Sequence, residues 1–131
     1  MKRRVWAILL TALAMGCAGQ VPEIPVKADY NTITFEEIQA ALEKRPLQNA
    51  FELIEYLRPK YFMPRMQTTV NQGVMQREPI VYLNNVRFGK ISELYNINIL
   101  QIHEIVYLKS NEATQRFGIG HEGGAIIIST R

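Results

Sequence analysis

The 131-residue chain has a single cysteine and no apolar run long enough to cross a membrane. Its longest apolar stretch, Val5 to Met15, is interrupted by Thr11, whereas a membrane-spanning helix requires roughly 20 apolar residues. One cysteine cannot form an internal disulfide, so a disulfide-stabilised framework is excluded. With 47% hydrophobic residues, the chain can still form a compact core and is too apolar to be disordered throughout.

Neither sign of charge dominates beyond the N-terminus. The chain contains 15 Lys and Arg against 12 Asp and Glu, and three of the basic residues are Lys2, Arg3 and Arg4. A basic start, a short apolar stretch and then small residues are typical of a secretory signal peptide. Loss of residues 1–16 would remove these three charges and no acid, which leaves 12 residues of each sign. No basic stripe interleaved with aromatics remains, so nucleic acid is not an expected partner.

The position of Cys17 resembles the lipidation site of bacterial lipoproteins. Cys17 follows the apolar run directly and is preceded by Gly16. In that family a signal peptidase cuts before a cysteine that carries a diacylglycerol, so the resemblance implies that residues 1–16 are a lipoprotein signal peptide. The alternative is cleavage of an ordinary signal near Ala18 or Gly19, with loss of the cysteine. In that family the residue after the cysteine directs sorting between membranes. Ala18 at this position implies the outer membrane of a bacterial cell envelope.

Residues 17–31 are expected to form a tether, and residues 32–131 a globular domain. Pro22 and Pro25 fix their own φ angles and push the preceding residues toward extended geometry. A segment with two prolines could be an edge strand at most. The tether would connect the lipid anchor to the domain.

Two amphipathic helices are predicted at the start of the globular domain. Thr34, followed three residues later by a glutamate, is a capping-box pattern, and Pro46 ends the first helix. The second helix is predicted from about Leu47 to Leu57, where apolar residues recur at helical spacing. The polar residues 65–78 are expected to form a weak strand at Gln67–Val70 and a flexible loop.

Apolar segments in the second half predict strands. The expected strands are Ile80–Leu83, Val86–Phe88, Ile102–Lys109 and Ala125–Thr130, and short helical turns are expected at Ile91–Tyr95 and Asn111–Arg116. Asn84-Asn85 suits a two-residue hairpin turn, because both residues tolerate positive φ. A helix is the alternative for residues 102–109, since Leu100, Glu104 and Leu108 are spaced by four.

The predicted fold class is therefore α+β, with a small mixed sheet of three to five strands and two helices. Three consecutive isoleucines in the last strand indicate that it is buried on both faces. The residues expected on strands of one sheet are Ile80, Leu83, Val106, Ile126 and Ile128, and Phe51 and Ile54 of the second helix are expected to cover one face.

The second half of the chain resembles the plug domain of TonB-dependent receptors. The segment from Ile102 to Lys109, then Phe117-Gly118, then Gly123 to Arg131, follows the family's order. That order is a strand of the form Ile-Glu-Arg-Ile-Glu-Val, an aromatic–glycine pair, and Gly-Gly-Val-Ile-x-Ile-x-Thr with a basic residue. The family's hairpin Asp-Gly is Asn84-Asn85 here, and its Gly-Pro is Ser110-Asn111. The resemblance implies a free-standing plug-like domain, without the receptor's barrel and its uptake activity.

No set of residues in the sequence predicts catalysis, a metal or a cofactor. His103 and His121 are each followed by a glutamate, but a catalytic metal site requires about three protein ligands. None of the serines stands in the Gly-x-Ser-x-Gly pattern of a nucleophile elbow. The glycines near residue 120 lead into a strand, whereas a dinucleotide-binding fingerprint opens a helix. We therefore expect a protein that is not an enzyme.

The candidate binding residues lie in the glycine-rich loop Gly118–Gly124 and in the hairpin turn Asn84-Asn85. Four glycines would bring backbone N–H groups close to a partner, and His121 and Glu122 are the long polar side chains of this loop, flanked by Arg116. The alternative is that the glycines serve only the turn before the last strand. A second candidate surface is the apolar segment Tyr61-Phe62-Met63.

The sequence therefore predicts a protein-interaction module that a lipid anchors at the outer membrane. Its partner would be an outer-membrane protein. The alternative is a ligand-capture lipoprotein that passes a solute to an uptake receptor.

Replacing Cys17 by serine tests the anchor. Cys17→Ser is expected to block lipoprotein processing, because serine cannot form the thioether that carries the lipid. The variant should accumulate as precursor or as freely soluble protein, measured by membrane partition and by the mass of the mature chain. Unchanged membrane partition would contradict lipidation at this residue.

Overall fold

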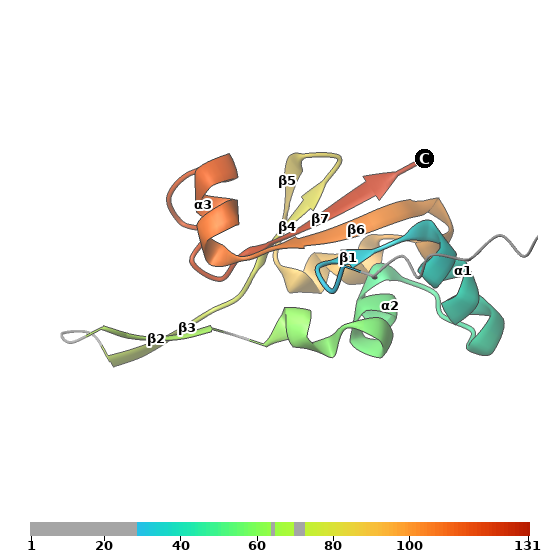
Figure 1. Cartoon of the computed structure of the whole chain (residues 1–131), viewed down its shortest axis with the longest axis horizontal. Helices are drawn as coiled ribbons and strands as arrows, with labels where there is room; N and C mark the ends of the chain where they lie inside the picture. Colours follow the sequence, from blue (N-terminus) through green and yellow to red (C-terminus); the bar gives the residue numbers. More distant parts are fainter. Residues whose placement is uncertain (1–28, 64, 70–72) are drawn as a thin grey trace, which may run out of the picture.

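A computed structural model describes residues 29–63, 65–69 and 73–131, with only the backbone described for residues 65–69 and 73–76 (Figure 1). A five-stranded mixed sheet has the strand order β1-β6-β7-β4-β5, which confirms the predicted α+β class. Its strands are β1 (Thr32–Ile33), β4 (Ile80–Leu83), β5 (Val86–Gly89), β6 (Ile102–Leu108) and β7 (Ala125–Thr130). Strand β7 is parallel to β4 and antiparallel to β6, and the two outer pairs are antiparallel.

Helices cover both faces of this sheet (Figure 1). The helices are α1 (Phe35–Lys44), α2 (Ala50–Leu57) and α3 (Ser110–Phe117), with 3₁₀ helices η1 (Pro59–Phe62), η2 (Ile91–Asn96) and η3 (Ile99–Gln101). Ile38 of α1 and Ile54 of α2 share one core cluster with Ile126. On the opposite face, Ala113 of α3 packs in a second cluster with Ile127.

Strand β7 is buried along most of its length. Ile126 and Ile128 are fully buried on the α2 face, and Ile127 is 5% exposed on the α3 face. Successive side chains of a strand point to opposite faces, so three consecutive isoleucines fit only a strand that is covered on both faces. The prediction for this segment is confirmed, as is the placement of Phe51 and Ile54 against one face of the sheet.

The first helix begins as predicted and the second begins later. The Thr34 hydroxyl accepts a hydrogen bond from the Glu37 backbone N–H, and the Glu37 carboxylate accepts one from the Thr34 N–H, both at 3.4 Å. The prediction that α2 starts at Leu47 is wrong, because Asn49 caps the helix and accepts a hydrogen bond from the Glu52 N–H at 3.0 Å. Asn49 has extended backbone and bridges to Asn98. An asparagine is a strong N-cap residue, and its side chain here fixes the start of the helix.

The hairpin that connects β4 and β5 has the predicted turn. Asn84 and Asn85 have φ angles of 50° and 66°, the left-handed pair that a type I′ turn requires. The register of the two strands shifts between Val81 and Tyr82, so the edge strand carries a bulge.

Two segments differ from the prediction in length. Residues 65–78 contain β2 (Arg65–Thr69) and β3 (Gly73–Arg77), which pair with each other as an antiparallel hairpin. This hairpin extends away from the body of the domain (Figure 1), whereas the sequence predicted one weak strand that ended at Val70, a residue outside the described ranges. The predicted helical turn at Asn111–Arg116 is the eight-residue helix α3. Residues 102–108 form a strand, so the helical alternative is wrong.

Truncating Ile126 tests the central position of β7. Ile126→Ala is expected to lower the free energy of unfolding by about 2–5 kcal/mol, because it removes buried methyl groups and leaves a cavity. Urea unfolding followed by circular dichroism measures the change. The matched control is Ile119→Ala, since Ile119 is 94% exposed and its truncation should change stability by less than about 0.5 kcal/mol. A loss below about 1 kcal/mol for Ile126→Ala would place this residue outside the core.

Candidate functional site

The glycine-rich loop is held tightly against neighbouring backbone. A side chain at Gly123 would collide with the Glu78 carbonyl, and a Cβ at Gly124 would lie 2.6 Å from the Leu108 carbonyl oxygen. Gly124 also has a φ of 90°, which residues with a side chain rarely adopt. Its carbonyl accepts a hydrogen bond from the Ile80 N–H at 3.1 Å. The second half of the loop is therefore part of the sheet's packing.

His121 points into the protein. The residue is 5% exposed, its Nδ1 lies 2.8 Å from the Gly118 carbonyl oxygen, and its Nε2 lies 2.7 Å from the Tyr82 hydroxyl. A carbonyl oxygen can only accept, so Nδ1 carries the proton in the neutral ring and Nε2 accepts from Tyr82. The imidazole also lies beside the Phe117 ring. The sequence suggested a binding role for His121, whereas in the structure both ring nitrogens have partners within the chain and hold the loop against the sheet.

The other predicted binding residues also have partners within the chain. The Glu122 carboxylate lies 2.8 Å from the Arg77 guanidinium, and Arg116 donates a hydrogen bond to the Asn85 side-chain oxygen at 2.7 Å. The Asn84 side chain donates to the Thr130 hydroxyl and accepts from the Thr130 N–H, both at 2.9 Å. The structure therefore brings Arg116 and Asn85 together, and Asn84 fastens the turn to the end of β7.

The two ends of the glycine-rich loop lie at different distances from the hairpin turn. Gly124 contacts Ile80 at the start of β4, whereas the Asn84 N–H donates to the Ile128 carbonyl at the strand's end, at 2.8 Å. Four residues of strand separate these contacts by about 13 Å. Because β4 runs parallel to β7, the end of the loop at Gly124 is apart from the turn, whereas the start of the loop follows Arg116, which contacts Asn85. Gly124, which directly precedes β7, therefore lies at the start of β4, and the hairpin turn follows the end of β4.

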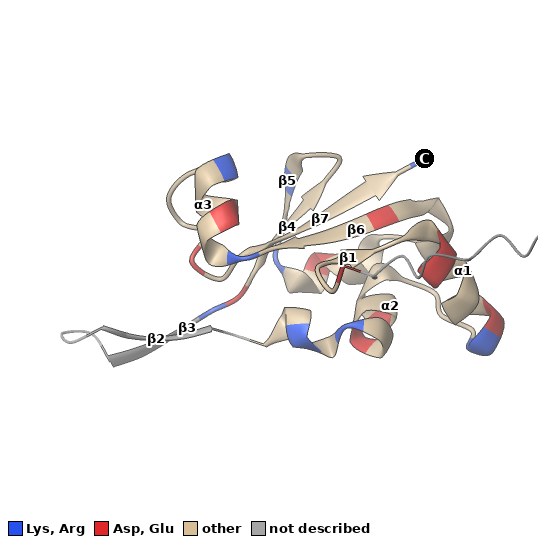
Figure 2. Cartoon of the chain, in the orientation of Figure 1, with Lys and Arg blue, Asp and Glu red and all other residues tan. Residues whose placement is uncertain are grey.

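The loop instead lines a hollow between the start of β4 and the edge strand β5. The hollow has a volume of about 620 Å³ and is lined by Arg77, Glu78, Pro79, Ile80, Arg87, Gly89, Lys90, Gly120 and Gly123. The basic positions of β5 and of the end of β3 are blue in Figure 2. Sequence reasoning missed this site, since the hollow joins a hairpin, a loop and a strand edge that are distant in sequence. The available signal was the pair of basic residues, Arg87 and Lys90, on either side of Phe88-Gly89.

Strand β5 is an open edge of the sheet. Among the described residues it pairs only with β4, and Val86 and Phe88 are 69% and 39% exposed. The opposite edge, β1, has two residues. An unpaired strand edge offers backbone N–H and C=O groups to another strand.

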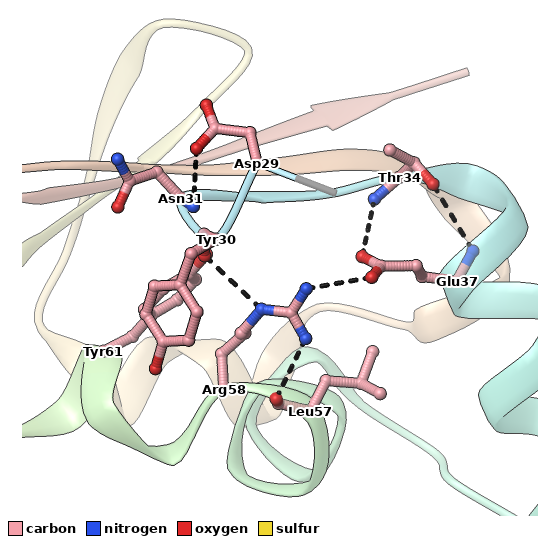
Figure 3. Close-up of polar contacts among 8 residues, drawn as sticks. All are labelled: Asp29, Tyr30, Asn31, Thr34, Glu37, Leu57, Arg58 and Tyr61. Atoms are coloured by element: carbon pink, nitrogen blue, oxygen red, sulfur yellow. Dashed lines mark hydrogen bonds and ion pairs between the residues drawn. The ribbon is translucent and has the colours of Figure 1, made fainter. Parts of the chain in front are cut away.

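A second polar cluster joins the start of the described chain to the helices (Figure 3). Arg58 forms an ion pair with Glu37 at 2.9 Å and donates to the carbonyls of Leu57 at 3.1 Å and Tyr30 at 3.4 Å. The Tyr61 hydroxyl donates to the same Tyr30 carbonyl at 2.6 Å, and burial raises the pKa of this hydroxyl well above its ordinary value. The Arg58 and Glu37 side chains are 14% and 27% exposed. This cluster is turned inward and stabilises the domain.

The structure revises two predictions, one about the end of the tether and one about the apolar segment Tyr61-Phe62-Met63. Residues 29–31, assigned to the tether, are held on the domain, since the Asn31 carbonyl accepts a hydrogen bond from the Tyr107 N–H at 2.7 Å. Tyr61, predicted as part of an exposed apolar surface, is 1% exposed, whereas Met63 is 61% exposed. Phe62 is half-buried and stacks on Phe51. Of the predicted Tyr61-Phe62-Met63 surface, Met63 is exposed, Phe62 is partly exposed and Tyr61 is in the core.

The described residues contain no cluster of acidic and histidine side chains suited to a metal ion. No three His, Cys, Asp or Glu side chains in the described ranges lie where they could hold a metal ion. His103 is exposed and stacks on Phe35 with ring centroids 5.9 Å apart. Hydrogen bonds from the backbone and from Thr34 lower the pKa of the Glu36 carboxyl. Within the same ranges, no helix is both apolar enough and long enough to cross a membrane.

Comparisons of the chain with protein-family models, curated proteins and solved structures found no match.

Removing the His121 imidazole tests its structural role. His121→Ala is expected to lower the free energy of unfolding by about 2–3 kcal/mol, because the Gly118 carbonyl and the Tyr82 hydroxyl lose their buried partner. Tyr82→Phe, which removes one of these hydrogen bonds, should cost about 1 kcal/mol. The control is His103→Ala, at an exposed histidine, with an expected loss below about 1 kcal/mol. Equal melting temperatures for the two alanine variants would contradict the inward role of His121.

Proposed function

We propose that the protein is a non-enzymatic lipoprotein of the bacterial cell envelope that binds a protein partner at the outer membrane. The signal-like N-terminus, the position of Cys17 and the resemblance of residues 79–131 to receptor plug domains support the location. Lipid at this cysteine would hold the domain close to membrane proteins, since each buried CH₂ contributes roughly 0.8 kcal/mol to membrane binding. The domain itself would supply the contact surface.

The open edge of β5 carries the proposal. Helices pack against both faces of the sheet, so its unpaired backbone N–H and C=O groups lie at its edges. An extended segment of another protein can add to such an edge through main-chain hydrogen bonds, while its side chains meet those of the edge strand. Val86 and Phe88 provide exposed apolar contacts for that segment.

Crosslinking at Val86 tests this function. A photo-crosslinking amino acid at position 86 is expected to form an adduct with one envelope protein, identified by mass spectrometry after irradiation of cells. The matched control is position 100, because Val86 and Leu100 are both 69% exposed and Leu100 lies on η3, away from β5. The variant Val86→Glu should reduce recovery of the partner at least tenfold, whereas Leu100→Glu should leave recovery unchanged. Both variants should keep the wild-type melting temperature, since both sites are exposed.

The same adducts at positions 86 and 100, or none at position 86, would show that β5 is not the contact edge. Repeating the experiment with Cys17→Ser separates anchoring from binding. Loss of the adduct in cells, with binding retained in extracts, would indicate that the lipid serves to bring the two proteins together.

A further inference from the structure

The hollow beside β5 has an excess of basic side chains. Arg77, Arg87 and Lys90 line it, and Glu78 is the acid among its lining residues. The carboxylate of Glu122 is paired with Arg77. Glu93 packs behind Gly89, and its carboxylate accepts a hydrogen bond from the Asn96 side chain. The carboxylates of Glu122 and Glu93 are therefore engaged with other groups, and Glu78 is one acid against the three basic residues that line the hollow.

Two of the cations have no acidic partner in the described part of the chain. The ion pairs of the described residues are Arg58–Glu37 and Arg77–Glu122, so neither Arg87 nor Lys90 meets a carboxylate. Both residues are exposed and belong to β5 or follow it directly. A strand added to β5 would pass beside both charges.

We propose that the partner segment that adds to β5 is acidic, with carboxylates that enter the hollow beside Arg87 and Lys90. The inference rests on the proposed function and specifies the chemistry of its partner. Gly120 leaves the mouth of the hollow open, because a Cβ built there would meet no atom within 4 Å. Opposite charges on adjacent strands stabilise pairing, and like charges oppose it.

The charges of β5 argue against a second copy of this chain as the occupant. Antiparallel pairing of two β5 strands about a two-fold axis places equivalent residues near each other. Arg87 and Lys90 of one copy would then face those of the other, without an acid on either strand. Such pairing brings like charges together, whereas an acidic segment neutralises them.

The expected effect is moderate and depends on salt. A contact between a cation and a carboxylate at an exposed surface changes affinity by up to about fivefold. Two such contacts give a preference of roughly 5- to 25-fold for an acidic over a basic segment at low salt. The preference should shrink at an ionic strength of about 1 M, where the Debye length falls to roughly 3 Å.

Peptide binding to the full chain in nonionic detergent tests the inference. The probes are two fluorescent peptides, Thr-Val-Glu-Val-Glu-Val-Thr and Thr-Val-Lys-Val-Lys-Val-Thr, measured by anisotropy at low and high salt. The acidic peptide is expected to bind at least fivefold more tightly. Arg87→Gln with Lys90→Gln should abolish that preference. The matched control is Lys44→Gln with Arg45→Gln, which also removes two positive charges, here from the exposed end of α1. This control should keep the preference for the acidic peptide.

Two competitor arms identify the occupant. An acidic peptide with N-methylated backbone should bind at least tenfold more weakly, because it cannot add to a strand. Free succinate should compete only weakly. If the methylated peptide binds as tightly as the unmethylated acidic peptide, or if succinate does, strand addition to β5 is overturned in favour of a site for small anions. Sedimentation tests for a second copy of the chain. A dimer that is lost in Val86→Glu would show that a second copy, and not an acidic segment, occupies β5.

Failure of this inference is distinguishable from failure of the proposed function. Equal affinity for the two peptides, or an unchanged preference in Arg87→Gln with Lys90→Gln, overturns the acidic partner. If an envelope protein still crosslinks at position 86 in that case, the proposed contact at the edge of β5 stands and its partner segment is not acidic. Absence of the crosslink overturns the edge contact itself.

Discussion

The burial of strand β7 on both faces determines how the rest of the chain is arranged. Ala125 to Ile128 are all buried, so one layer must cover each face of the sheet. Helices α1 and α2 supply one layer and α3 the other. The edges carry the sheet's unpaired backbone groups, and β5 is the longer of the two outer strands. The candidate contact surface is thus a consequence of how the core is built.

The signals that predicted the fold are local ones. Thr34 and Glu37 form a capping box within four residues, and Asn84-Asn85 forms a turn in which both residues need positive φ. A run of isoleucines can be satisfied only by a strand covered on both faces. Each of these patterns is decided by neighbours in sequence, so the class of the fold and most element positions could be predicted.

The site could not be predicted in the same way, because it depends on pairing between distant segments. The direction of β7 relative to β4 separates Gly124, at the end of the glycine loop, from the hairpin turn. His121 looked like an exposed ligand group in sequence, and its partner Tyr82 lies 39 residues away. The bridge between Asn49 and Asn98, 49 residues apart, also joins distant segments. The hollow beside β5 joins three such segments.

The Arg58 cluster has a mechanical consequence for a domain held by its N-terminal side. Tension applied at residue 29 reaches the sheet through β1, which pairs with β6 over two residues. Beside these two register pairs, two side chains hold the Tyr30 carbonyl and would share the load. These are the Arg58 guanidinium and the Tyr61 hydroxyl, which pass it to α2 and η1. If the domain is anchored as proposed, a pull on its N-terminal side would load the helical layer through these contacts as well as the sheet through β1.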